Sequence, residues 1–168
     1  MNISAPSVSP EASSKPWDLW SERVGYLCIR HPLTSEPREN LFLCLKRMRY
    51  LSKGCAVVVG ADRRMEGLLT ERAILASVDS DETASRLSVG EVMDEEAPSI
   101  QAEAPLSEAL RLFVSRQLTY LPVLGDDRAV HGLLSVKSIT FFLAEHFPAA
   151  LMNLPPEKRA VSRRSEGA

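Results

Sequence analysis

The sequence predicts a mixed α/β (α+β) fold made of two copies of one β-α-β-β-α unit. First, the phrase GLLTERAI at residues 67–74 returns as GLLSVKSI at residues 132–139, an offset of 65 residues (132 − 67). Second, each copy alternates short apolar runs with segments of helical periodicity. Third, the same offset aligns further positions without a gap, among them Val24 with Val89, Leu41 with Leu106, Leu45 with Leu110 and Asp62-Arg63 with Asp127-Arg128. A repeat of this length indicates two similar structural units.

The second copy contains the expected elements in order. Residues 98–100 favour a short extended segment, and residues 105–117 have the apolar spacing of a helix, with Ser107 as a candidate N-cap. The runs 120–124 and 130–135 predict the two strands of a hairpin. Residues 136–147 predict a closing helix that ends before a proline. Pro122 predicts an edge strand or a point where the hydrogen-bond ladder is open.

The first copy follows the same order, with an extended segment at 32–35, a helix at 39–51, a hairpin at 55–70 and a helix at 71–78. The inward side chains of its first helix are Leu41, Cys44, Leu45 and Met48. We therefore place the first domain at 24–78 and the second at 89–147, joined by a polar linker at 78–87. The polar segments 1–17 and 155–168 are predicted to be disordered tails.

Composition limits the class of protein. Among 168 residues, 45% are hydrophobic and 25% are charged, which is enough for a sizeable core. The net charge of −2 favours neither nucleic acid nor a membrane surface, and no apolar run approaches the length of a membrane span. Three irregularly spaced cysteines, Cys28, Cys44 and Cys55, indicate buried reduced thiols rather than a disulfide framework or a zinc site. These observations favour a cytoplasmic protein.

Catalytic motifs are missing from the sequence. His31, His131 and His146 belong to no nucleophile–base pair and to no metal-ligand spacing, and there is no glycine-rich phosphate loop. We therefore expect no enzyme, no catalytic residue and no metal site. Upstream of the first copy, Trp17, Trp20 and Val24 stand at helical spacing, which is typical either of a short helix covering the module or its dimer partner or of an exposed binding patch.

The repeated wording resembles a known family. The segments SVGEVM at 88–93, YLPVL at 120–124 and the G-apolar-apolar-Thr/Ser strand ends at 67–70 and 132–135 are similar to those of tandem cystathionine-β-synthase (CBS) domains, also called a Bateman module. The resemblance covers residues 24–147. It implies two units packed through their sheets about a pseudo-twofold axis, with clefts that receive ATP, ADP, AMP or S-adenosylmethionine. It also implies a homodimer that regulates a partner protein without catalysis.

The resemblance implies a ligand site that this chain has altered. The family phrase ends G-x-x-Thr/Ser-x-x-Asp, in which the hydroxyl lies at a helix start that favours phosphate and the Asp binds the ribose hydroxyls. Thr70 and Ser135 keep the hydroxyl, but Ala73 and Ser138 replace the Asp. Losing a charged acceptor weakens binding by about a hundredfold. Two functions stay open: weak adenine-nucleotide sensing, and a dimerising interaction module that no longer binds a ligand.

We favour the second-unit cleft, because Ser138 keeps a polar group there. Lys137 would attract phosphate or would be a solvated helix charge, and Thr70 and Ser135 would contact phosphate or simply cap helices. Strand residues would flank the base in addition to forming core. The candidate ligand-binding residues are Ser135, Ser138, Lys137, Ile100, Leu121, Pro122, Val123 and Thr70.

Overall fold

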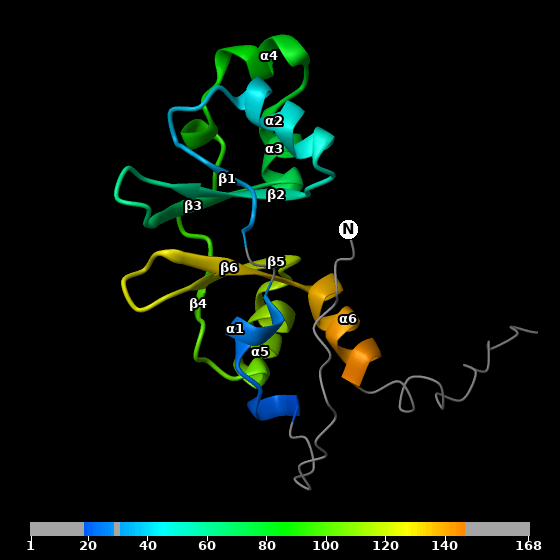
Figure 1. The fold of residues 1–168 in the computed structure, drawn as a ribbon. Coiled ribbons are helices and arrows are strands. Elements are labelled where there is room, and N and C mark those ends of the chain that lie inside the picture. The colour runs from blue at the N-terminus through cyan, green and yellow to red at the C-terminus, as the bar shows by residue number, and fades with distance from the viewer. Residues whose placement is uncertain (1–18, 29–30, 147–168) are drawn as a thin grey trace, which may run out of the picture.

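A computed structural model describes residues 19–28 and 31–146 as two three-stranded sheets that face each other, with helices on the outer side of each sheet (Figure 1). The strand orders are β1-β2-β3 and β4-β5-β6. The first unit consists of β1 (Thr34–Ser35), α2 (Leu41–Tyr50), β2 (Cys55–Val59), β3 (Met65–Thr70) and α3 (Glu71–Ser77). The second consists of β4 (Ile100–Gln101), α5 (Leu106–Arg116), β5 (Tyr120–Leu124), β6 (Val130–Ser135) and α6 (Val136–His146).

The two units are copies of each other in detail, which confirms the predicted β-α-β-β-α repeat. In each sheet the first strand pairs in parallel with the second, and the second pairs antiparallel with the third. Each hairpin has an irregularity at the same repeat position, at Val58/Val59 and at Val123/Leu124. Even the left-handed backbone positions recur at the offset of 65, as Ser52 with Gln117 and Arg63 with Arg128.

An approximate twofold axis relates the units. Arg64 and Ala129, which are repeat equivalents because 129 − 64 is 65, form an antiparallel bridge with each other. A residue can pair with its own equivalent only where the symmetry axis passes between the two. Beside this point, buried Cys55, Val57, Leu68 and Leu133 form the apolar contact between the sheets.

The segments that precede the units are exchanged between them. Helix α1 (Val24–Leu27) comes before the first unit, yet Val24 is fully buried in the core of the second unit, and α1 lies beside α5 in Figure 1. The 3-10 turn η2 (Val89–Glu91) comes before the second unit, and Val89 is fully buried in the core of the first. Of the segment predicted to cover the module, Val24 is buried against the second unit, as part of α1.

Equivalent hydrogen bonds hold both exchanged segments. The Val24 amide donates to the carbonyl of Ala104 at 2.9 Å, and the Val89 amide donates to the carbonyl of Glu39 at 2.9 Å. The next residue is a glycine in both segments, and a Cβ there would lie 3.0 Å (Gly25) or 3.1 Å (Gly90) from a backbone carbonyl oxygen. Only glycine allows this close approach without a shift of the backbone. Each unit is thus completed by a segment of the other.

Three local predictions need correction or completion. The predicted polar linker 78–87 is wrong, because α4 (Asp81–Arg86) forms there, with the Ser80 side chain accepting from the Thr83 amide and Ala84 buried against the first unit. Ser107 is not the cap of α5, since that helix begins after Pro105 without a side-chain cap. Trp20 and Val24 do not share one helix, because a break separates η1 (Leu19–Ser21) from α1. Trp17 and the predicted tails lie outside the described residues.

Pro122 lies in the central strand of its sheet, not at an edge. Its repeat equivalent Val57 donates its amide to the carbonyl of Leu33 at 2.9 Å, towards the short first strand. Pro122 has no amide hydrogen and cannot make the matching bond. The second form of the prediction, an open point in the ladder, is therefore confirmed.

Candidate functional site

A cavity of about 510 Å³ lies at the boundary of the two units, within the size range of small-molecule sites. Its lining comes from segments that are far apart in sequence. The first unit contributes Pro32, Leu33, Lys53, Gly54 and Cys55, and the second contributes Tyr120, Leu133, Ser135, Lys137 and Ser138. The exchanged helix α1 adds Tyr26 and Leu27. Because both units form the wall, a bound molecule would report on their relative position.

Ser135 and Ser138 bind each other at the start of α6. The Ser138 amide donates to Ser135 Oγ at 3.1 Å, and the Ser135 amide donates to Ser138 Oγ at 2.9 Å. Ser138 Oγ also donates to the Ser135 carbonyl at 2.8 Å. This reciprocal pattern is a capping box, in which serine takes the place of the usual acidic residue. The Ser138 hydroxyl is therefore already engaged by the backbone and has little remaining capacity to accept from a ligand.

The middle of the cavity wall is poorly solvated. Burial raises the pKa of the Cys55 thiol to about 12; the negative charge of Glu71 adds to this rise and Lys53 opposes it. Burial also raises the pKa of Tyr120, with smaller contributions from Cys55 and Glu71. The Tyr120 hydroxyl lies directly over Gly54, where a Cβ would come within 2.1 Å of it. Glycine at position 54 therefore makes room for Tyr120 at the junction of the two units.

The structure separates the predicted site residues into two groups. Ser135, Lys137 and Ser138 line the cavity. Ile100, Leu121 and Val123 are buried in the core of the second unit, and Pro122 is fully buried in the same sheet. None of these four contributes to the cavity lining. Whether any of the seven contacts a ligand stays a prediction.

Thr70 occupies the position in the first unit that Ser135 occupies in the second, and it does not line this cavity. Its Oγ1 accepts from the Ala73 amide at 3.2 Å and caps α3. Ala73 has no side-chain acceptor to return the bond, so this cap is only half of the box formed at α6. The capping role considered for the two hydroxyls is confirmed at both helices.

Sequence reasoning missed the cavity residues contributed by the other unit. Pro32 and Leu33 line the same cavity as Ser135, although about a hundred residues separate them in the sequence. The sequence analysis predicted the strand residue Ile100 of the second unit as a ligand contact instead. The available signal was the family resemblance, which implies clefts between the two units and therefore lining residues from both.

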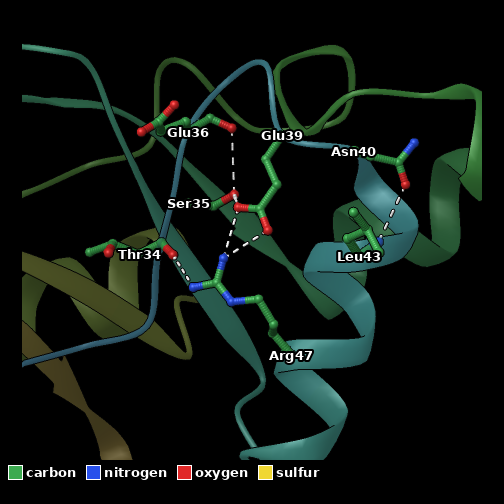
Figure 2. A network of polar contacts seen from close by, with 7 residues as sticks. All are labelled: Thr34, Ser35, Glu36, Glu39, Asn40, Leu43 and Arg47. Carbon is green, nitrogen blue, oxygen red and sulfur yellow. Dashed lines mark hydrogen bonds and ion pairs between the residues drawn. The ribbon is translucent and has the colours of Figure 1, made fainter.

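A second polar group belongs to the first unit alone (Figure 2). Arg47 donates to both carboxylate oxygens of Glu39, at 2.7 and 2.9 Å, and to the Thr34 carbonyl at 2.8 Å. Buried Ser35 donates to the same carboxylate at 2.6 Å. The second unit has Ile100, Ala104 and Leu112 at the positions of Ser35, Glu39 and Arg47. The network thus fastens β1 to α2 where the second unit uses apolar packing, and it lies apart from the cavity residues.

Within residues 19–28 and 31–146, no cluster of three or more histidine, cysteine or acidic side chains is arranged to hold a metal ion. His131 is half-buried and lines none of the cavities described here. Among the helices that the structure describes, none has the length and apolarity to cross a membrane.

Comparisons with known proteins agree with this architecture. A model of the CBS domain family matches residues 89–145. The chain is similar to a CBS domain-containing protein of unknown function from Bacillus anthracis, with a TM-score of 0.69 at 17% identity over 77% of this chain and 97% of that one. It is also similar to the CBS domain pair of protein MJ0100, solved in complex with 5′-methylthioadenosine and S-adenosyl-L-methionine, with a TM-score of 0.64 at 15% identity over 73% and 99% of the two chains.

Sequence relatives are distant. Protein MK0525 of Methanopyrus kandleri is 25% identical over 124 residues, which cover 71% of this chain and 61% of that protein, so the chain spans less than two thirds of this relative. A 17.7 kDa protein of Acidianus ambivalens is 20% identical over 117 residues, 70% of each chain.

The fold and the shared cavity define a paired module in which two β-α-β-β-α repeats face each other across an approximate twofold axis. This is the architecture of CBS pairs, as the structural neighbours show. A model of the CBS domain family matches the second unit directly, so the chain contains a CBS domain at residues 89–145. The family resemblance seen in the sequence is confirmed.

Proposed function

We propose that this chain is a regulatory module that binds an adenine nucleotide weakly in the cavity between its units and signals the bound state to a partner protein. The cavity carries the proposal, because its wall combines a helix N-terminus, two lysines and apolar side chains from both units. A helix N-terminus favours phosphate through its dipole and its first-turn amides, and apolar walls favour a base. The adenosyl ligands of the MJ0100 domain pair support the same chemical class.

Signalling would follow from the shared wall. A ligand that touches both units shifts the population of their relative arrangements only if it binds one arrangement better than another. Both exchanged segments are anchored across the boundary, so such a shift would move α1 and η2 together with the units that they complete. A partner contacting either segment would detect the change.

Titration of the protein with ATP, ADP and AMP at millimolar concentrations, followed by calorimetry and by thermal unfolding, tests the proposal. A bound nucleotide at ten times its dissociation constant stabilises the fold by about 1.4 kcal/mol. A folded protein that shows neither heat nor a raised melting temperature with any of the three would end the proposal.

The repeat provides a matched variant pair. Lys137 lines the cavity, whereas Arg72, its equivalent in the first unit, does not, and both are exposed. We expect Lys137→Glu to abolish nucleotide-induced stabilisation and Arg72→Glu to leave it unchanged. Equal loss in both variants would indicate a general charge effect and not a site.

One observation favours a second function, a dimerising interaction module without a ligand. The Ser138 hydroxyl is engaged in the α6 cap, and Ala73 offers no acceptor in the first unit. In that case Ser138→Asp would create strong nucleotide binding where the native protein has none.

Both proposed functions include the formation of a homodimer. Exposed apolar side chains lie on the outer helices, with Leu43 at 55%, Leu75 at 81% and Val114 at 80% exposure. Covering such side chains with a second copy is favourable. Light scattering should give twice the chain mass, and a monomer at micromolar concentration would contradict the dimer.

A further inference from the structure

The cavity between the units continues into a larger groove on the first unit. This groove, of about 1020 Å³, runs between α2 and α3 and has an apolar base that includes Phe42, Leu45 and Ile74. Five residues line both spaces, namely Ser52, Lys53, Gly54, Tyr120 and Lys137. The two spaces therefore meet at the contact between Tyr120 and Gly54.

Basic side chains gather where the spaces meet and beyond. Lys53 and Lys137 line both, and Lys46 and Arg49 line the groove. Three carboxylates also contribute, Glu71 and Asp81 in the groove and Glu145 in the cavity. In the part of the chain that the structure describes, no carboxylate lies within ion-pair distance of Lys53 or Arg49. These two exposed cations are therefore available to an anionic ligand.

The second unit shows that the fold does not require these charges. At the offset of 65, Lys53 corresponds to Leu118 and Arg49 to Val114. Leu118 packs against the core of the second unit, and that unit forms the same helix and hairpin without either cation. The repeated architecture therefore gives no structural reason for the positive charges of Lys53 and Arg49.

We infer that the cavity takes a nucleotide with more than one phosphate, and that Lys53 and Arg49 contact the phosphates beyond the first. The inference rests on the proposed function. A first phosphate at the start of α6 lies beside Lys137, because that residue is in the first turn of the helix. Lys137 also lines the groove, so a chain of phosphates continuing past it enters the space lined by Lys53 and Arg49. An uncharged adenosyl group, or AMP, would leave that space without a matching charge.

The test compares AMP, ADP and ATP by calorimetry at low ionic strength with EDTA present, so that the phosphates keep their full charge. We expect ATP to bind about tenfold more tightly than AMP, as two further charge-assisted contacts allow. The double variant Lys53→Ala/Arg49→Ala should bind ATP no better than AMP, because its affinity for ATP falls by about tenfold more than its affinity for AMP. The control Arg111→Ala/Arg116→Ala removes two exposed cations of α5 that line neither space and should retain the ATP preference.

The outcomes separate this inference from the proposed function. Equal affinities for AMP and ATP, or a double variant that weakens both equally, would overturn the inference and leave nucleotide sensing in place. No binding of any of the three nucleotides would overturn both. Inorganic tripolyphosphate adds an independent readout, because it should compete with ATP for the wild type and lose that ability in the double variant. Failure to compete with the wild type would also count against the groove.

Discussion

The cap of α6 provides a direct test of how Ser138 is used. Ser138→Ala removes the acceptor of the Ser135 amide, at 2.9 Å, and the donor to the Ser135 carbonyl, at 2.8 Å. Both hydrogen bonds are part-buried. Losing an intramolecular hydrogen bond costs about 1 kcal/mol, within a range of about 0.5–1.5 kcal/mol, so the loss of the Ser138 hydroxyl should cost about that much. For a domain of this size, that loss lowers the melting temperature by about 4 °C.

Ser138→Asp should not lower the melting temperature as Ser138→Ala does. An aspartate keeps an acceptor for the Ser135 amide and places a negative charge in the first turn of α6, where the helix dipole favours it by about 0.3–1 kcal/mol. The variant should therefore melt at or above the temperature of the wild type. Thr140→Ala is the matched control, because Thr140 lies on the same helix and its exposed hydroxyl only donates back to the Val136 carbonyl.

Differential scanning calorimetry of the four proteins without ligand is the assay. The expected order of melting temperatures is Ser138→Asp at or above wild type, Thr140→Ala close to wild type, and Ser138→Ala lowest. If Ser138→Ala melted together with Thr140→Ala, the Ser138 hydroxyl would contribute nothing to the cap and would be available to a ligand. That result would refute the reasoning given for weak binding.

Three further predictions concern the remainder of the fold. Val24→Ala and Val89→Ala should each lower the free energy of unfolding in urea by about 1–3 kcal/mol in a single transition, because both side chains are fully buried in the opposite unit; two transitions would contradict the exchange. Gln117→Gly should raise that free energy by about 0.5 kcal/mol, because Gln117 has a φ of 52°, and a loss would count against this backbone conformation. The Cys55 pKa, raised from 9.0 to about 12, predicts a stability contribution that is complete below pH 9 and is lost as the pH rises towards 12, because the unfolded chain releases the proton first. The stability advantage of wild type over Cys55→Ala should therefore shrink between pH 8 and pH 10, and a constant difference would contradict the burial of this thiol.

The repeat made most of the fold predictable from the sequence. Apolar spacing placed α2 and α5 correctly because each buries one face, as Leu41, Cys44 and Met48 do in the first unit. The polar appearance of residues 78–87 hid α4, since one buried residue, Ala84, is enough to anchor a helix of this length when Ser80 caps it. Sequence composition alone does not distinguish such a short capped helix from a linker.

The site was only partly predictable. Ser135 and Lys137 were found because they lie within a repeated phrase, whereas Lys53, Gly54 and Leu33 reach the cavity through the twofold arrangement of the units. Ile100 and Val123 were predicted to contact a ligand in addition to forming core, and both side chains are buried in the core of the second unit. Contacts between units depend on tertiary packing, which local patterns do not encode.

Comparison of equivalent positions separates what the fold requires from what only one unit has. Shared features, such as the close approach at Gly25 and Gly90, serve the architecture, because both units need them to receive the exchanged segment. A charge present in only one unit, such as Lys53 opposite Leu118, needs a different explanation. If the charge of Lys53 served folding alone, exchanging Lys53 and Leu118 would change the stability of the protein without changing its affinity for any nucleotide. If it serves a ligand, Lys53→Leu would change affinity with little change in the melting temperature of the free protein, because the lysine is exposed and has no ion-pair partner among the described residues.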